Sequence, residues 1–162
     1  MFHMTPRLKF MKLFGDNRPR AVAELRGSDL YPDLIGFVYF YDVSNGGILI
    51  ESEVFGLPEA GSLKTPAFFG FHIHEKGDCS DHFSNTGGHY NPNRSPHPHH
   101  AGDFPPLRAN DGYAWLAFYD NGLELYDIVG RAVVVHKDAD DFTSQPSGNA
   151  GEMIACGEIR MM

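Results

Sequence analysis

Histidine is concentrated in one stretch of this chain. The sequence has nine histidines, and seven of them lie between residues 72 and 103. A neutral imidazole offers a nitrogen lone pair near neutral pH, so histidine is a common ligand for transition metals in proteins. The concentration therefore predicts a metal site built largely from this segment.

The segment begins with two histidines that are separated by one residue, His72 and His74, inside the run Gly70-Phe71-His72-Ile73-His74. The apolar and aromatic residues around them predict a strand, on which alternate side chains share a face. Both rings would then point the same way and could reach one ion. The same spacing also occurs on ordinary polar strand faces, so the pair alone is weak support for a metal site.

Further candidate ligands lie in loop-like sequence and at the end of a later apolar run. Glycine and proline mark residues 87–103 as loop rather than sheet. Much later, the apolar run 128–135 ends at His136. A site that uses all of them would join distant parts of the chain. The candidates within the loop are His89, His97, His99, His100 and Asp103.

Five separated stretches resemble the copper/zinc superoxide dismutases and occur in the order of that family. The resemblance runs from about Pro19 to the C-terminus. It implies a Greek-key β fold and a centre that holds both copper and zinc. The matching stretches are GFHIHEKGDC from Gly70, GGHYNP from Gly87, HAGD from His100, GRAVVVHKDADD from Gly130 and GNAGEMIACG from Gly148.

The resemblance implies two adjacent metal sites that share one ligand. It assigns His72, His74, His89 and His136 to copper, and His89, His97, His100 and Asp103 to zinc. His89 would bridge both ions as an imidazolate and, with His136, would be catalytic. Only two residues separate His97 from His100, fewer than the family's zinc loop leads us to expect, so His99 stays as an alternative to either neighbour.

Three residues outside the ligand sets also match the family. Asp140 would accept hydrogen bonds from one copper-bound and one zinc-bound histidine, which fixes ring orientation. The alternative is one more acid in a solvated loop. Cys79 and Cys156 would form a disulfide that closes a loop of about 77 residues and stabilises the fold by roughly 4 kcal/mol. The alternative here is a pair of buried thiols in a reducing compartment.

One position departs from the family. Three residues before the second cysteine, where the family has an arginine that draws superoxide to copper, this chain has Met153. A thioether replaces neither the charge nor the forked donors of a guanidinium. The net charge of −8 would also repel an anion, unless Lys76 or Arg94 supplies local positive charge.

The resemblance implies an enzyme that disproportionates superoxide to dioxygen and hydrogen peroxide by cycling copper between Cu(II) and Cu(I). The missing arginine predicts a rate below the family norm. It also supports a second hypothesis, a copper/zinc storage or delivery protein with little turnover. Storage requires neither a bridging histidine nor a separate zinc site, so the enzyme is favoured.

Short strands rich in β-branched and aromatic residues must position these ligands. They predict an all-β fold, either a Greek-key β-sandwich of immunoglobulin-like architecture or a flattened eight-stranded barrel, with long metal-binding loops. Asn45-Gly46 and Asn121-Gly122 predict tight hairpin turns. The predicted strands are 21–25, 35–43, 48–55, 67–74, 113–119, 123–126 and 128–136.

Aromatic residues on these strands invite a role in ligand stacking, but packing in a core or a subunit contact is favoured. The aromatic content of 13% predicts an exposed apolar patch, and hence a homodimer. The residues in question are Tyr39, Tyr41, Tyr113, Trp115 and Phe118.

Length and composition limit the remaining alternatives. A chain of 162 residues with 42% hydrophobic content is long enough for one domain, which we place at residues 17–162 after an N-terminal extension of residues 1–16. Within the extension, residues 8–14 would add a strand or wrap the barrel. The acidic balance and the lack of basic runs argue against nucleic acid as a partner. No apolar run is long enough for a membrane span. The absence of a secretory pattern favours a cytoplasmic protein, with an exported form as the alternative.

Overall fold

The computed structural model describes residues 7, 17–43, 46–61 and 65–162. The elements in this part of the chain are almost all β-strands, as predicted. They are β1 (Ala21–Gly27), β2 (Ile35–Asp42), β3 (Ile48–Phe55), β4 (Ala67–Phe69), β5 (Phe71–His74), the 3-10 turn η1 (Ser84–Thr86), β6 (Leu107–Asn110), β7 (Tyr113–Asp120), the short helix α2 (Leu125–Ile128), β8 (Ala132–His136) and β9 (Met153–Met161).

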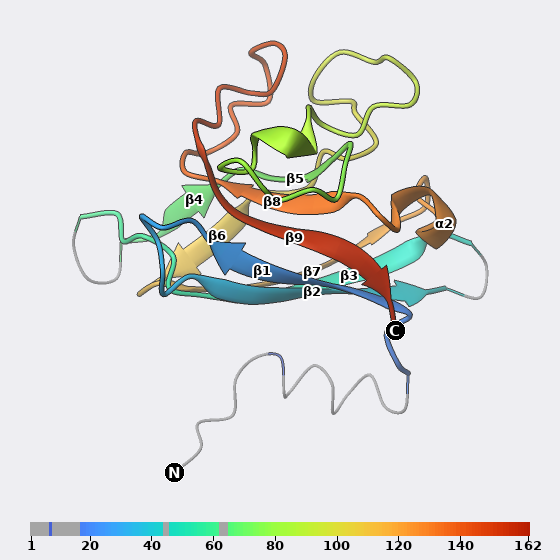
Figure 1. Cartoon of the computed structure of the whole chain (residues 1–162), viewed down its shortest axis with the longest axis horizontal. Coiled ribbons are helices and arrows are strands. Elements are labelled where there is room, and N and C mark those ends of the chain that lie inside the picture. Colours follow the sequence, from blue (N-terminus) through green and yellow to red (C-terminus); the bar gives the residue numbers. More distant parts are fainter. Residues whose placement is uncertain (1–6, 8–16, 44–45, 62–64) are drawn as a thin grey trace.

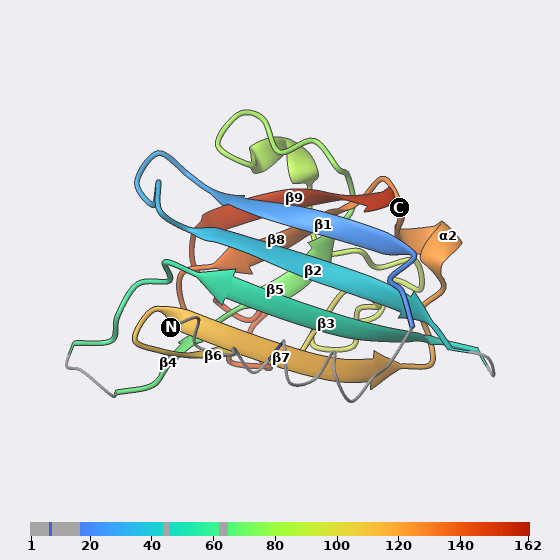
Figure 2. The ribbon, with the colours of Figure 1, turned by 90° about the horizontal axis from the view of Figure 1, so that it is seen from below.

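All strand pairs are antiparallel, and the strands follow the order β4-β6-β7-β3-β2-β1-β9-β8-β5. The two ends of this order, β4 and β5, are consecutive in the chain and are separated only by Gly70. The sheet therefore curls back on itself, and Figures 1 and 2 show it as a flattened barrel. This confirms the predicted all-β barrel, but with nine strands rather than eight and with the predicted strand 67–74 divided in two.

Gly70 marks the bend between β4 and β5. A Cβ atom at this position would lie 2.7 Å from the Cβ of Ala150 and 3.2 Å from the Cβ of His136, so a larger residue would push these two residues away. Its amide donates to the carbonyl of Asp138, and its carbonyl accepts from the amide of His136. The bend thus holds β5 against the end of β8.

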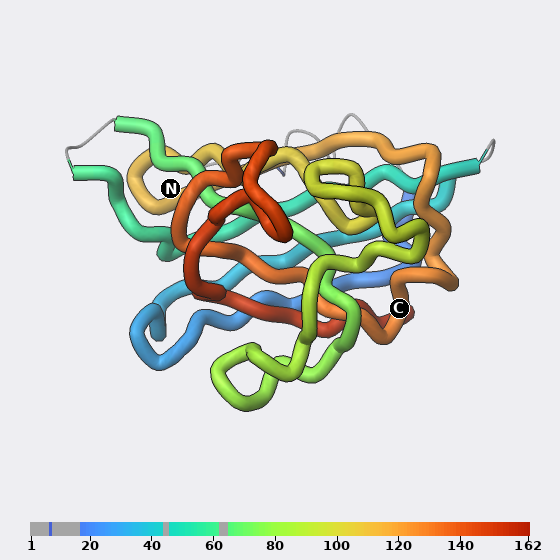
Figure 3. Tube along the Cα trace, turned by 90° about the horizontal axis from the view of Figure 1, so that it is seen from above, coloured from blue at the N-terminus to red at the C-terminus, as the bar shows by residue number. Residues whose placement is uncertain are grey.

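Strand alternation decides which side of the barrel wall each histidine occupies. Phe71 and Ile73 of β5 point into the main hydrophobic core, so His72 and His74 point outward. Both histidines are nevertheless buried, because long loops cover that side of the wall. Figures 1 and 3 show two of these loops, 88–106 and 137–152, side by side above β5 and β8.

Helix α2 replaces the strand predicted at residues 123–126. The Asp120 carboxylate accepts hydrogen bonds from the amides of Gly122 and Leu123, which turns the chain out of β7. Leu125 and Ile128, three residues apart, then bury their side chains from one helical turn. The predicted hairpin at Asn121-Gly122 is therefore wrong.

Other predicted boundaries differ less. The strand predicted to begin at Ile128 begins at Ala132, and β2 pairs with β3 as expected. Asn45 of the first predicted turn lies outside the described residues, as do residues 8–14. β6 and β9 are not among the predicted strands. β6 directly follows two prolines, and β9 contains Gly157; proline and glycine both weaken the sequence signal for a strand.

The predicted aromatic residues divide between the two sides of the wall. Phe118 packs edge-on against Phe104 at 4.9 Å between ring centroids, next to the core. Trp115 donates from Nε1 to the carboxylate of Glu51, 2.8 Å away.

Among the helices that the structure describes, none combines the length and apolar character needed to cross a membrane.

Candidate metal centre

Two isolated β-bridges bring loop residues against β5. One joins His74 to His89 and the other joins His72 to Asp103. On the other side of β5, the antiparallel pairing with β8 sets Phe71 opposite Val135, so His136 follows directly. Candidate ligands that are up to 64 residues apart in sequence thereby meet at one place on the barrel wall.

The candidate ligands form two groups in which the nitrogen or oxygen atoms lie within 4.8 Å of one another. His89 belongs to both groups. We call them the four-histidine group and the histidine–aspartate group. The first consists of His72, His74, His89 and His136, and the second of His89, His97, His100 and Asp103.

The four-histidine group is compact and buried. His74 Nε2 and His136 Nε2 lie 3.1 Å apart. The rings of His72 and His89 stack at 3.9 Å between centroids. The exposed fractions of the four residues are 0 to 7%. Four imidazoles therefore converge in a space from which most water is excluded.

In the histidine–aspartate group, the Asp103 carboxylate is the common neighbour. Its Oδ1 lies 2.8 Å from His89 Nδ1, and its Oδ2 lies 3.0 Å from His97 Nδ1 and 3.3 Å from His100 Nδ1. Three imidazoles and one carboxylate form a set that zinc commonly binds with tetrahedral geometry. His99, the alternative ligand, is exposed and belongs to neither group.

In four of the histidine rings, a hydrogen bond to one ring nitrogen leaves the lone pair on the other nitrogen available for a metal. The carbonyls of Gly87 and Gly151 can only accept, so the Nδ1 atoms of His74 and His136, at 2.9 and 3.1 Å, donate to them. The Nε2 atoms of these two residues then carry lone pairs that face each other. Two lone pairs at 3.1 Å suit a shared cation.

Asp140 plays the same part for His72 and His97. Its Oδ2 lies 2.8 Å from His72 Nε2, and its Oδ1 lies 2.8 Å from His97 Nε2. Because an ionised carboxylate only accepts, both Nδ1 atoms are left with lone pairs. One carboxylate thus orients a ring of each group, which is where the sequence analysis placed it.

Three buried nitrogens in the described part of the chain have no hydrogen-bond partner: His72 Nδ1, His89 Nε2 and His97 Nδ1. His97 Nδ1 lies close to Asp103, but its orientation is not that of a hydrogen bond. Unpaired buried polar atoms are costly in a folded protein. All three belong to the two groups, so the donor set fits copper beside imidazoles and zinc beside imidazoles and a carboxylate.

Burial keeps several of these rings neutral. Burial among the other histidines lowers the pKa of His74 to about 3 and holds the pKa of His72 far below its ordinary value. Burial also lowers the pKa of His136 to about 4, although the Gly151 carbonyl favours the protonated ring. Neutral rings keep their lone pairs available near neutral pH.

Burial raises the pKa of Asp103, but hydrogen bonds from His89 and from the His100 amide outweigh this effect, and the pKa stays below its ordinary value. Burial also lowers the pKa of the His100 ring. The carboxylate is therefore ionised at neutral pH. A negative charge beside three imidazoles favours a cation in the histidine–aspartate group.

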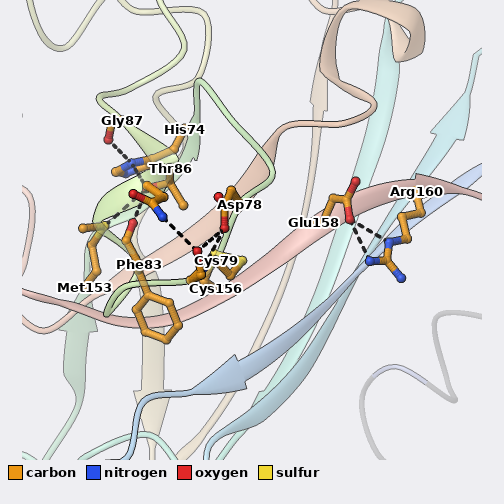
Figure 4. The surroundings of a disulfide bond; sticks show 12 residues. His74, Asp78, Cys79, Phe83, Thr86, Gly87, Met153, Cys156, Glu158 and Arg160 are labelled. Atoms are coloured by element: carbon orange, nitrogen blue, oxygen red, sulfur yellow. Dashed lines mark hydrogen bonds and ion pairs between the residues drawn. A yellow bond between two sulfur atoms is a disulfide. The ribbon is translucent and has the colours of Figure 1, made fainter.

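Thr86 was not among the predicted site residues. Its hydroxyl is fully buried, lies 3.1 Å from His74 Nδ1, donates to the carbonyl of Phe83 and lies 3.6 Å from the sulfur of Met153 (Figure 4). In sequence it is a threonine in a polar loop, which carries no signal for this role. The supporting carbonyls of Gly87 and Gly151 give no sequence signal either.

The predicted disulfide is formed. Cys79 and Cys156 are bonded, with an S–S distance of 2.01 Å, and join residues 77 apart in sequence. Figure 4 shows the bond between the loop that follows His74 and strand β9. The loop carries Thr86 and Gly87, so the disulfide fixes the segment that hydrogen-bonds to His74.

A pocket of about 670 Å³ opens over the groups. His74, His89 and His136 line it together with Met153, which pairs with His136 across β8 and β9. Arg94 is the one arginine or lysine among the described residues that line this pocket, and Lys76 lies outside the lining. The acids Glu75 and Glu152 also line it.

Comparison with known proteins identifies the family. Residues 34–159 match the family "Copper/zinc superoxide dismutase (SODC)". The chain is 35% identical to "Superoxide dismutase [Cu-Zn] 2" of Mesembryanthemum crystallinum, over 86% of this chain and 94% of that protein. It is 38% identical to "Extracellular superoxide dismutase [Cu-Zn]" of Oryctolagus cuniculus, over 77% of this chain and 54% of that protein.

Solved structures agree with the sequence relatives. The clock protein EA4 is 34% identical and has a TM-score of 0.75, with 91% of this chain and 98% of that chain covered. A SOD-like protein from Bacillus subtilis is 31% identical and has a TM-score of 0.73, with 85% and 96% covered. With its barrel fold, its shared histidine and these matches, the chain belongs to the copper/zinc superoxide dismutase family.

Proposed function

We propose that the protein is a superoxide dismutase that converts two superoxide anions and two protons to dioxygen and hydrogen peroxide. The observation that carries the proposal is the pair of ligand groups that share His89. The four-histidine group would hold copper, and the histidine–aspartate group would hold zinc. Bound copper supplies the electron transfer by alternating between Cu(II) and Cu(I).

The residues around the centre prepare the ligands. Asp140 and the carbonyls of Gly87 and Gly151 fix the rings of His72, His74 and His136 so that one lone pair of each faces the group. No rotation of these rings is then needed for binding. Preorganised ligands of this kind bind a metal more tightly than rings that must first be ordered.

The reaction also consumes protons, and we assign His89 and His136 as the catalytic histidines. His89 Nε2 faces the four-histidine group and lacks a hydrogen-bond partner in the described part of the chain. It can hold a proton there and release it to the departing peroxide. Asp103, 2.8 Å from Nδ1 of the same ring, supports the protonated form.

Delivery of the anion is the step in which this chain departs from the family. Met153 occupies the position of the arginine, and we propose that Arg94 supplies the positive charge in the pocket. Within the described part of the chain, Arg94 forms no ion pair that would neutralise it. Glu75 and Glu152 oppose its effect, so turnover below the family norm is expected.

The alternative proposal is a copper/zinc storage or delivery protein. Met153 favours it because the pocket lacks the arginine beside the four-histidine group. A protein named only as SOD-like shares the fold at 31% identity, so likeness in fold extends to proteins not named as dismutases. The shared His89 and the completeness of both groups favour the enzyme.

One experiment separates the two proposals. The protein is loaded with copper and zinc, the metal content per chain is measured by elemental analysis, and superoxide decay is followed spectrophotometrically. We expect both metals to bind and decay to be about 10- to 100-fold faster than with His136→Ala, which removes a proposed ligand. If the protein binds both metals but superoxide decays no faster with it than with His136→Ala, the result would support storage.

A further inference from the structure

The loop that follows β8 lies against the loop that carries His97 (Figures 1 and 3). Asp140 from the first loop contacts the His97 ring. A second residue of the same loop, Gln145, contacts the His97 backbone. Neither the predicted ligands nor the assigned supporting residues include Gln145.

Gln145 and His97 form a reciprocal pair of hydrogen bonds. The His97 amide donates to Gln145 Oε1 at 2.9 Å, and Gln145 Nε2 donates to the His97 carbonyl at 2.8 Å. A side-chain amide can satisfy a backbone donor and acceptor in this way because it carries both functions. The two bonds fix the position of the His97 backbone relative to the loop after β8.

The ring of His97 is held independently. Asp140 Oδ1 lies 2.8 Å from His97 Nε2, and Gly148 packs beside the Asp140 carboxylate and the His97 ring. A Cβ atom on Gly148 would lie 2.6 Å from His97 Nε2 and would overlap the Asp140 carboxylate. The loop 140–148 therefore surrounds His97, with Asp140 and Gly148 at the ring and Gln145 at the backbone.

Hydrogen bonds within the loop keep Gln145 in place. Asp141 Oδ1 accepts from the amides of Thr143 and Ser144, each at 2.8 Å. The Gly148 amide donates to the Ser144 carbonyl, and the Asp141 amide donates to the Gly148 carbonyl. The Ser144 hydroxyl donates to Asp141 Oδ2, and this bond, together with the two amide bonds to the carboxylate, lowers the pKa of Asp141 to about 2. The loop can thus present Gln145 as a fixed group.

We propose that Gln145 is a positioning residue for the histidine–aspartate group: its two hydrogen bonds to the His97 backbone set where His97 Nδ1 stands relative to Asp103. The inference deepens the proposed function and rests on its zinc site. His97 Nδ1 lies 3.0 Å from Asp103 Oδ2, so a small displacement of the backbone would open this group. Zinc retention then depends on a residue outside the ligand set.

The test measures zinc retention rather than activity. Protein loaded with copper and zinc is dialysed for set times against a chelator, and the zinc left per chain is determined by elemental analysis. Gln145→Met keeps the length of the side chain but removes both hydrogen bonds. Gln145→Glu keeps the acceptor, loses the donor and sets an anion against the His97 carbonyl. Thr143→Ala is the matched control, because Thr143 lies in the same loop and its hydroxyl contacts only Asp141, whereas Gln145 Nε2 contacts the Thr143 backbone carbonyl, which the substitution keeps.

We expect zinc loss to be about tenfold faster in both Gln145 variants and within twofold of the unchanged protein in Thr143→Ala. Cobalt in place of zinc gives a second reading, since its visible spectrum reports the geometry of the group and should change only in the Gln145 variants. Loss rates in both Gln145 variants equal to that of Thr143→Ala would overturn the inference. Failure of the unchanged protein to retain zinc would instead contradict the proposed function.

Discussion

Single side chains in this centre serve two partners at once. His89 presents Nδ1 to the histidine–aspartate group and Nε2 to the four-histidine group. Asp140 contacts His72 with one oxygen and His97 with the other. A change at either residue therefore reaches both groups. This sharing is what distinguishes the centre from two metal sites that happen to be neighbours.

The resemblance implies an arginine where this chain has Met153, and introducing that arginine tests its effect. We predict that Met153→Arg raises the rate of superoxide decay by about tenfold at low ionic strength, because a fixed cation beside the four-histidine group attracts the anion. The gain should shrink near 0.15 M salt, where the Debye length is about 8 Å. Decay rates measured over a salt series give the result, and a salt-independent rate would contradict the electrostatic explanation.

Removing Arg94 should have the opposite effect. We predict a severalfold slower decay for Arg94→Ala and a weaker dependence on salt, since Arg94 is the pocket cation among the described lining residues. Arg108→Ala is the matched control, because it removes an equal charge from an exposed position outside the pocket. If superoxide decays equally fast with Arg94→Ala and with Arg108→Ala, Arg94 does not guide the anion.

At the scale of elements, strands and loops divide the ligands. His72 and His74 lie on β5, and His136 ends β8, so the barrel wall places three members of the four-histidine group. The histidine–aspartate group comes entirely from loop residues, and isolated β-bridges join two of them, His89 and Asp103, to β5. The position of His97 depends on contacts between loops, which is where Asp140 and Gln145 act.

The features of the fold and of the candidate site that could be predicted from the sequence are those with a strong local signal. Alternation placed His72 and His74 on one face of a strand, and turn-rich sequence marked the loop that holds Asp103. The helix at 125–128 was missed because its four residues show no sustained period, and the turn before it depends on a side chain, Asp120. The roles of Thr86 and Gln145 depend on contacts between segments distant in sequence, which composition and period do not record.

The disulfide connects the loop that supports His74 to β9, and its removal should be costly. We predict that reduction lowers the free energy of unfolding of the metal-free protein by about 4 kcal/mol, because a closed loop of 77 residues restricts the unfolded chain. Denaturant unfolding with and without reductant measures this difference. The double variant Cys79→Ser with Cys156→Ala is the control, since reductant should leave its stability unchanged. A loss below about 1 kcal/mol would contradict the prediction.

The whole molecule carries a net charge of −8, so its overall field opposes an anionic substrate. Local cations can outweigh that field only at short range, which makes the pocket lining decisive. We keep cytoplasmic placement and a homodimer as proposals. One curated relative is named as an extracellular enzyme, so the family alone does not assign a compartment.

Burial of several neutral histidines makes the stability of the whole metal-free molecule depend on pH. In the unfolded chain, histidine binds a proton below its ordinary pKa of 6.5, whereas in the fold the pKa is about 3 for His74 and about 4 for His136. Between these limits the unfolded state binds more protons, so stability falls as pH falls. Above pH 6.5 both states are neutral and the effect disappears.

We therefore predict that the unfolding midpoint of the metal-free protein is flat above pH 6.5 and falls between pH 6.5 and pH 4. In that window, each such histidine lowers the free energy of unfolding by up to about 1.4 kcal/mol for each unit that the pH falls. Thermal unfolding at a series of pH values measures the slope. His136→Gln should reduce the slope, whereas His82→Gln should not, because His82 is exposed. A slope confined to the region below pH 4 would assign the loss to carboxylates such as Asp103, whose pKa is lowered, rather than to the histidines.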